Sequence, residues 1–244
     1  MKSFCQISIF LYCLAISYSA CSQVNDTIPP ALVAVYLGLI PEPQEVYSGG
    51  QYAVGKAFHI EGTSYLESAD FEKGSITING LNYENILLNY DIQDDQLVTF
   101  HPRNYQRIII NAQRVNSFTL ANGRCFIRTN ENKEYFLHRR GYYEVLLKGD
   151  IAVLAKHIKV EELKKDQNSK ETKRYFFIHT THFFIRQKDR FYRINKKKDL
   201  ALVLDIPKKQ LNQSLKEQQL KFKKQTAESL VTIVKAYLTN ESKD

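Results

Sequence analysis

The sequence predicts a mainly β protein with C-terminal helices, in which about ten strands form an antiparallel meander or a barrel-like sheet. Two observations lead to this prediction. Between residues 46 and 195, short segments rich in β-branched and aromatic residues recur at intervals of roughly 8–12 residues. After residue 195 the hydrophobic period changes from two to 3.6, the period of an α-helix. We expect a signal peptide at 1–22, an antiparallel β domain at 23–195, and a helical appendage at 196–244 that packs on it.

The N-terminal segment has the organisation of a secretory signal peptide. Lys2 supplies a positive charge, Ile7–Ile16 forms a short apolar run, and small residues follow from Ser17 to Ser22. The apolar run is too short to span a bilayer, and no later run approaches the roughly 20 residues that a membrane helix needs. We therefore expect an exported protein with no transmembrane helix in the mature chain.

Cys21 is a candidate lipidation site, because small residues precede it as in the cleavage box of bacterial lipoproteins. Tyr18 departs from that box, which has Leu, Val or Ile at this place, so ordinary cleavage near residues 20–23 stays open. Cys125 is the one cysteine in the expected folded body, and no disulfide is expected there.

The β domain is predicted from segments separated by Gly, Asn, Asp or Lys, the residues of tight turns. The expected strands include Ser75–Asn79, Ile86–Tyr90, Leu97–Phe100, Arg107–Asn111, Ser117–Leu120, Cys125–Arg128, Glu134–His138, Tyr142–Leu147, Ile151–Val160, Tyr175–Ile178, Phe183–Arg186 and Phe191–Ile194. The polar segment Glu162–Lys173 lacks any periodicity and is expected to form a surface loop between strands.

Three helices are expected after the strands. Asn195 could cap a short helix that carries Leu200, Val203 and Leu204, and Pro207 suits the first turn of a second. The last helix has one apolar face, formed by Ala227, Leu230, Val231, Val234, Tyr237 and Leu238.

The formal net charge of +8 is unevenly distributed along the chain. Residues 23–150 contain 11 Lys or Arg against 15 Asp or Glu, whereas residues 151–244 contain 22 against 11. Export argues against a nucleic-acid partner, and lysine, not arginine, dominates the excess. We expect contact with an anionic envelope surface or a protein partner. The candidate anion-contact residues are Lys196, Lys197, Lys198, Lys208, Lys209, Lys223 and Lys224.

No motif for catalysis, a cofactor or a metal is found, so no such residues are assigned and no cofactor is expected. His179 and His182 are the nearest to a metal motif, but residues three apart on a strand point to opposite faces. Asp91, Asp94 and Asp95 lack the spacing of a calcium loop and are typical of a turn.

Several phrases resemble a family of uncharacterised exported proteins of the Bacteroidota. They are Val46–Tyr52, Gly74–Gly80, Tyr83–Asp91, Gly141–Leu147 and the stretch from Pro207 to Lys224. The resemblance implies export, strands followed by helices, and a location in a Gram-negative envelope or periplasm, or outside the cell. It implies no activity.

Taken together, these features indicate an exported cell-envelope protein that is non-enzymatic and acts through surface interaction. One alternative is a barrel-like carrier or sensor that holds an apolar small molecule among inward-facing Tyr and Phe side chains. The other alternative is an enzyme of an unrecognised type.

Overall fold

The computed structural model describes residues 29–39, 43–53, 60–129, 131–165 and 173–241. The chain divides into two compact units, residues 1–41 and 42–244. The described part of the first unit contains the apolar helix α2 (Pro30–Leu39). The expected signal peptide and Cys21 lie outside the described residues. Among the helices of the described residues, none has the length and apolar character needed to cross a membrane.

The second unit contains the sheet and the remaining helices, and the chain is mainly β, with 40% strand and 23% helix. The strands are β1 (Ile60–Glu61), β2 (Glu72–Ile78), β3 (Leu81–Asp91), β4 (Gln96–Phe100), β5 (Arg107–Ile109), β6 (Val115–Thr119), β7 (Cys125–Arg128), β8 (Tyr142–Leu147), β9 (Ile151–Lys165), β10 (Lys173–Gln187) and β11 (Arg190–Ile194). The helices are α3 (Gln44–Tyr47), α4 (Lys197–Val203), α5 (Lys208–Glu217) and α6 (Thr226–Glu241).

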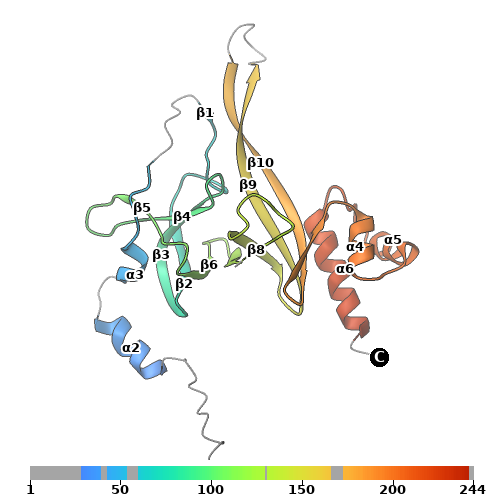
Figure 1. Cartoon of the computed structure of the whole chain (residues 1–244), viewed down its shortest axis with the longest axis horizontal. Helices are drawn as coiled ribbons and strands as arrows, with labels where there is room; N and C mark the ends of the chain where they lie inside the picture. Colours follow the sequence, from blue (N-terminus) through green and yellow to red (C-terminus); the bar gives the residue numbers. More distant parts are fainter. Residues whose placement is uncertain (1–28, 40–42, 54–59, 130, 166–172, 242–244) are drawn as a thin grey trace, which may run out of the picture. The chain divides into compact units, whose positions relative to one another are not determined.

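All described strands belong to one sheet, with the order β1-β10-β9-β8-β7-β6-β2-β3-β4-β5, and β11 pairs with β10 (Figure 1). The first half-sheet, β2–β5, and the second half-sheet, β6–β11, meet where β6 pairs with β2. The predicted meander with C-terminal helices is confirmed. The barrel-like alternative is wrong, because the sheet does not close. Pairing is also not purely antiparallel, since β1 runs parallel to β10.

Most observed strands begin or end a few residues away from the expected bounds, and at three places the difference is larger. Glu134–His138 forms turns, because Tyr135 alone is buried while Phe136 and Leu137 point to solvent, so no alternating pattern supports a strand. Tyr175–Ile178 and Phe183–Arg186 belong to one strand, β10, which pairs with β9 over its whole length. The polar segment predicted as a loop partly extends these two strands, since β9 ends at Lys165 and β10 begins at Lys173.

Two large apolar clusters hold the second unit together. One lies between strands β2–β8 and includes the rings of Tyr90, Phe118, Phe126 and Tyr142. The other joins β9–β11 to the helices, with Leu230 and other residues of α6 among its fully buried members. The apolar face predicted for the last helix therefore packs on strands of the sheet and on the neighbouring helices.

Candidate functional site

A groove of about 1420 Å³ lies among helices α4, α5 and the start of α6. Its lining residues are Asn195, Lys196, Lys197, Lys198, Lys208, Leu211, Asn212, Leu215, Lys216, Gln219, Leu220, Lys221, Phe222, Lys223 and Thr226. Seven of these are lysines, and none is acidic. The groove therefore concentrates positive charge, and its volume exceeds that of a drug-sized pocket, roughly 300–1,000 Å³.

The seven lysines are all exposed, and within the described part of the chain none of them forms an ion pair. Lys197 donates a hydrogen bond from Nζ to Oδ1 of Asn212 across the groove, at 2.8 Å. Leu211, Leu215 and Phe222 form an apolar base under the lysines. Like charges around one depression repel each other, and a bound anion would relieve that repulsion.

Local structure explains why the lysines converge. Asp199 accepts hydrogen bonds from the backbone N–H groups of Asn195 and Lys196, at 3.0 and 2.8 Å, which fixes the first turn of α4. Pro207 is the N-cap of α5, one residue before the first turn where it was expected. The N-cap of α4 is Lys196 and not Asn195, so that expectation is wrong by one residue. A turn closed by the Lys224 N–H and the Lys221 carbonyl, at 2.8 Å, then returns the chain to the groove.

Five of the seven candidate anion-contact residues line the groove: Lys196, Lys197, Lys198, Lys208 and Lys223. Lys209 and Lys224 are exposed but are not part of the lining. Lys216 and Lys221 also line the groove, and Lys216 was missed by sequence reasoning. Helical spacing alone would not have found Lys216, because at 3.6 residues per turn it lies almost in line with Lys209, which does not line the groove, and farther round the helix from Lys208.

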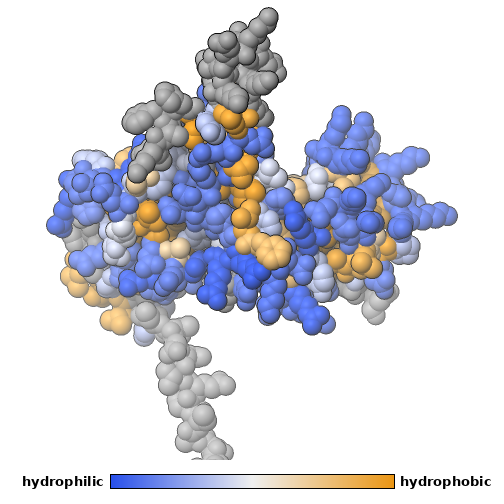
Figure 2. Space-filling view, turned by 45° about the horizontal axis from the view of Figure 1, so that its top comes forward, coloured by the Kyte–Doolittle hydropathy of each residue, from blue (hydrophilic) through white to orange (hydrophobic). Residues whose placement is uncertain are grey.

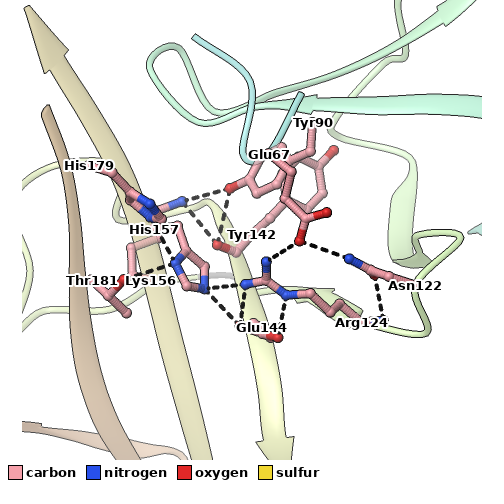
Figure 3. A network of polar contacts seen from close by, with 10 residues as sticks. All are labelled: Glu67, Tyr90, Asn122, Arg124, Tyr142, Glu144, Lys156, His157, His179 and Thr181. Carbon is pink, nitrogen blue, oxygen red and sulfur yellow. Dashed lines mark hydrogen bonds and ion pairs between the residues drawn. The ribbon is translucent and has the colours of Figure 1, made fainter. Parts of the chain in front are cut away.

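A second polar cluster lies on strands β7–β10 of the second half-sheet and the turn before β7 (Figure 3). Glu144 on β8 accepts two hydrogen bonds from Arg124, from Nε at 2.7 Å and from Nη2 at 2.8 Å. His157 on β9 places Nε2 at 2.7 Å from the same carboxylate. Arg124 also bonds Glu67, which lies nearer the surface, at 2.9 Å. No sequence motif links these residues, which is why sequence reasoning did not find the cluster.

His157 has partners at both ring nitrogens. Nε2 lies 2.7 Å from the Glu144 carboxylate and 3.0 Å from Nη2 of Arg124, and Nδ1 lies 3.1 Å from Thr181 Oγ1 and 3.2 Å from His179 Nε2. Burial alone would raise the pKa of Glu144, but the hydrogen bonds from Arg124 and His157 lower it to about 2. Burial, and the neighbouring positive charges after it, lower the pKa of His179 to about 4.

Glu144, His157 and Thr181 have the residue types of a hydrolase triad, but the surroundings do not fit that chemistry. Thr181 lies opposite His157 in the regular β9–β10 ladder, not at a helix N-terminus or a tight turn, where two backbone N–H groups could point together at a developing oxyanion. Arg124 neutralises the carboxylate that would support the histidine. The cluster is a charge-balanced structural network.

The remaining residues singled out in the sequence have ordinary structural roles. His179 contacts His157, whereas His182 contacts Arg193, as expected for opposite faces of a strand. Asp91 accepts hydrogen bonds from the N–H groups of Gln93 and Asp94, at 2.9 and 3.2 Å, so the turn interpretation is confirmed. Within the described residues, no group of three His, Cys, Asp or Glu side chains could hold a metal ion.

No family model matches the chain, and neither the curated proteins nor the solved structures contain a protein that matches it.

Proposed function

We propose that this is an exported, non-enzymatic protein of the cell envelope that binds an anionic lipid headgroup in the lysine groove. The observation that carries the proposal is the convergence of seven exposed lysines, with no acidic residue among them, on one groove of about 1420 Å³. Each lysine near an anionic lipid surface contributes about 1 kcal/mol of attraction. The expected signal peptide and the resemblance to exported proteins support the proposed location.

The apolar base of the groove favours a lipid over an acidic glycan. Leu211, Leu215, Leu220 and Phe222 lie beneath and between the charged side chains. An acidic glycan has no apolar part that gains from these contacts, whereas the acyl chains next to a phosphate headgroup do. Lysine, a compact charge on an apolar stem, suits this boundary between headgroup and chain.

The barrel-like carrier is not supported by an observation of comparable weight. The sheet is open, and the side chains of Tyr90, Phe118, Phe126 and Tyr142 contact one another between its strands, with Phe118 and Phe126 stacked at 4.8 Å between ring centroids. These residues, which the carrier hypothesis would place around a ligand, are packed against each other.

The test is vesicle binding by the full chain carrying Cys21→Ser, so that a lipid anchor at that residue cannot contribute. Vesicles of phosphatidylcholine with and without phosphatidylglycerol are compared at low and physiological salt. We expect binding only to the anionic vesicles and weaker binding at higher salt. Reversing the charge of Lys198, Lys208 and Lys223 to Glu should weaken binding at least about 100-fold, from about 1 kcal/mol per lysine.

The matched control reverses Lys209, Lys224 and Lys235, which are also exposed but lie outside the groove lining. Both triple variants have the same net charge, so a difference between them isolates the groove. The proposal fails if the two variants lose binding equally, or if anionic vesicles do not bind at low salt. It also fails if heparin binds through the groove while the vesicles do not, since the occupant would then be a glycan.

A further inference from the structure

Lys156, in the middle of β9, is fully buried, with an exposed fraction of 0%. Its ammonium nitrogen lies 2.5 Å from Oδ1 of Asp95, whose side chain is 8% exposed. Nζ also donates to the backbone carbonyl of Tyr142, at 3.0 Å. Asp95 ends the turn between β3 and β4, so the pair joins the first half-sheet to the second half-sheet. Figure 3 shows Lys156 with its hydrogen bonds to Tyr90 and Tyr142.

Aromatic rings surround the pair. The rings of Tyr90 and Tyr142 are nearly perpendicular, with centroids 5.7 Å apart, and Tyr90 also contacts the stacked rings of Phe118 and Phe126. Nζ of Lys156 lies 5.3 Å from the centroid of the Tyr143 ring. An apolar environment penalises the charged form of a buried amine. Burial accordingly lowers the pKa of Lys156, although Asp95 opposes this effect.

Tyr90 provides a hydrogen-bond donor at the carboxyl group. Its hydroxyl donates to the same Oδ1 of Asp95, at 2.5 Å. Burial, together with the charge of Asp95, raises the pKa of this phenol, so Tyr90 keeps its proton at every physiological pH. A donor held at this oxygen stabilises negative charge that develops there when a nucleophile adds to the carboxyl carbon.

Gly141 provides the space for this close approach. A Cβ atom at this position would overlap Oδ2 of Asp95 and come within 2.7 Å of Nζ of Lys156. The neighbouring lysine on the same strand, Lys159, differs in that its Nζ bonds only the backbone carbonyls of Thr63 and Tyr65. Amine, carboxyl group and donor are thus held in contact, an arrangement with a high effective concentration.

We propose that Lys156 and Asp95 condense into an amide cross-link, an intramolecular isopeptide bond. Within the pair, a proton passes from the ammonium group of Lys156 to the carboxylate of Asp95. The amine then adds to Cγ of Asp95 and forms the C–N bond, while Tyr90 supports the carboxyl oxygen. The C–O bond of the carboxyl hydroxyl then breaks, and this hydroxyl leaves as water with a proton from the amine. No oxidant, reductant or cofactor takes part, because the reaction is a dehydration. The apolar surroundings keep out the water that would hydrolyse the product.

The test is the mass of the purified full chain under denaturing conditions, with its N-terminus determined by peptide mapping. A cross-linked chain is lighter than its sequence by one water molecule, and protease digestion yields a branched peptide that contains both residues. A chain of full mass, with Lys156 and Asp95 in separate linear peptides, would overturn the proposal. This readout needs no variant, so it decides the question even if substitutions impair folding.

Variants locate the bond. Lys156→Arg keeps the positive charge but cannot form the amide, so it should have its full mass, whereas the control Lys159→Arg should still lack one water. Asp95→Asn should lose ammonia in place of water, because an amide nitrogen then leaves. Tyr90→Phe should slow the appearance of the cross-link after refolding. Loss of water that persists in Lys156→Arg would place the dehydration elsewhere and contradict the proposal.

Discussion

Arg124 bonds two carboxylates whose surroundings differ. This difference predicts how much each carboxylate contributes to the free energy of unfolding. Glu144 is buried and bonded at both oxygens, whereas the side chain of Glu67 is 55% exposed. We expect Glu144→Gln to lower the free energy of unfolding by about 2–4 kcal/mol, because Arg124 and His157 lose their shared partner. The matched variant Glu67→Gln should change it by less than about 1 kcal/mol. Urea unfolding at neutral pH measures both.

Glu144 also makes the stability of the fold depend on pH. Glu144 has a pKa of about 2 in the folded chain, below its ordinary value of 4.5, so its contribution to stability is full above pH 4.5 and is lost as the pH falls towards 2. Its replacement by Gln should remove that part of the acid sensitivity. His179, with a pKa lowered to about 4, weakens the fold as the pH falls from 6.5 to 4, although its exposure to solvent reduces the effect. An unchanged slope in Glu144→Gln between pH 4.5 and 2 would contradict the assignment.

Gly141 is a position where one methyl group should matter. Its Cβ would overlap Asp95 and crowd Lys156, and the backbone carbonyl of His138 would lie 2.8 Å away. We expect Gly141→Ala to cost about 1–3 kcal/mol, the range for overpacking a filled interior. Gly50→Ala is the control, because a Cβ there meets nothing within 4 Å. Thermal unfolding measures the midpoint of each variant. Equal midpoints would contradict the prediction, because they would show that the residues around Gly141 accommodate a methyl group at no cost.

Helix α6 is held against the sheet and the neighbouring helices by its buried apolar side chains. Leu230 has an exposed fraction of 0% and packs in the cluster that joins the helices to β9–β11, whereas Leu202 on α4 is 83% exposed. Leu230→Ala should lower the free energy of unfolding by about 2–5 kcal/mol, since it leaves a cavity. Leu202→Ala should change it by no more than about 0.5 kcal/mol. Similar losses in both, measured by urea unfolding, would show that α6 does not support the fold in this way.

Strands and helices could be predicted largely because their signals are local. Strands β3 and β9 are rich in aliphatic, β-branched and aromatic residues, and parts of them alternate apolar with polar residues. The 3.6-residue period of α6 is likewise visible in the sequence alone. The prediction failed at Glu134–His138, where Tyr135 and Phe136 suggested a strand. There the Asn132 side chain accepts the N–H of Glu134, and His138 takes a positive φ, so the chain turns. Propensity does not reveal such contacts.

The site could be predicted only in part, for a related reason. Lysines could be located by counting charges, but their convergence depends on how α4 and α5 pack, which no local pattern specifies. The cluster of Arg124, Glu144 and His157 and the pair of Lys156 and Asp95 join residues 13 to 61 positions apart. These contacts follow from strand pairing across the sheet, so they become visible only with the fold.

At the scale of the whole molecule, the Lys156–Asp95 pair adds a side-chain contact between the two half-sheets, whose strands meet where β6 pairs with β2. Backbone contacts accompany it: the N–H of Lys159 bonds the carbonyl of Ile92, at 3.3 Å, so the turn of the first half-sheet lies against β9. A covalent link between residues 61 positions apart would restrict the unfolded chain and stabilise the fold by about 4 kcal/mol on the chain-entropy model. The exposed hydrophobic residues Val160, Leu163 and Tyr175 lie further along the same hairpin. Figure 2 shows a hydrophobic stripe below the grey atoms at the top of the view.

The return of β6 to β2 has a consequence for the order in which the chain folds. Hairpins such as β2–β3 and β9–β10 join strands that are neighbours in the sequence, whereas the β2–β6 pairing closes a loop that contains β3, β4 and β5. Because the longer loop costs more entropy to close, we expect this pairing to form after the hairpins, when β2 and β6 are still unpaired edges. At that stage each edge could pair with another chain, so the speed of this single step governs the competition between folding and aggregation.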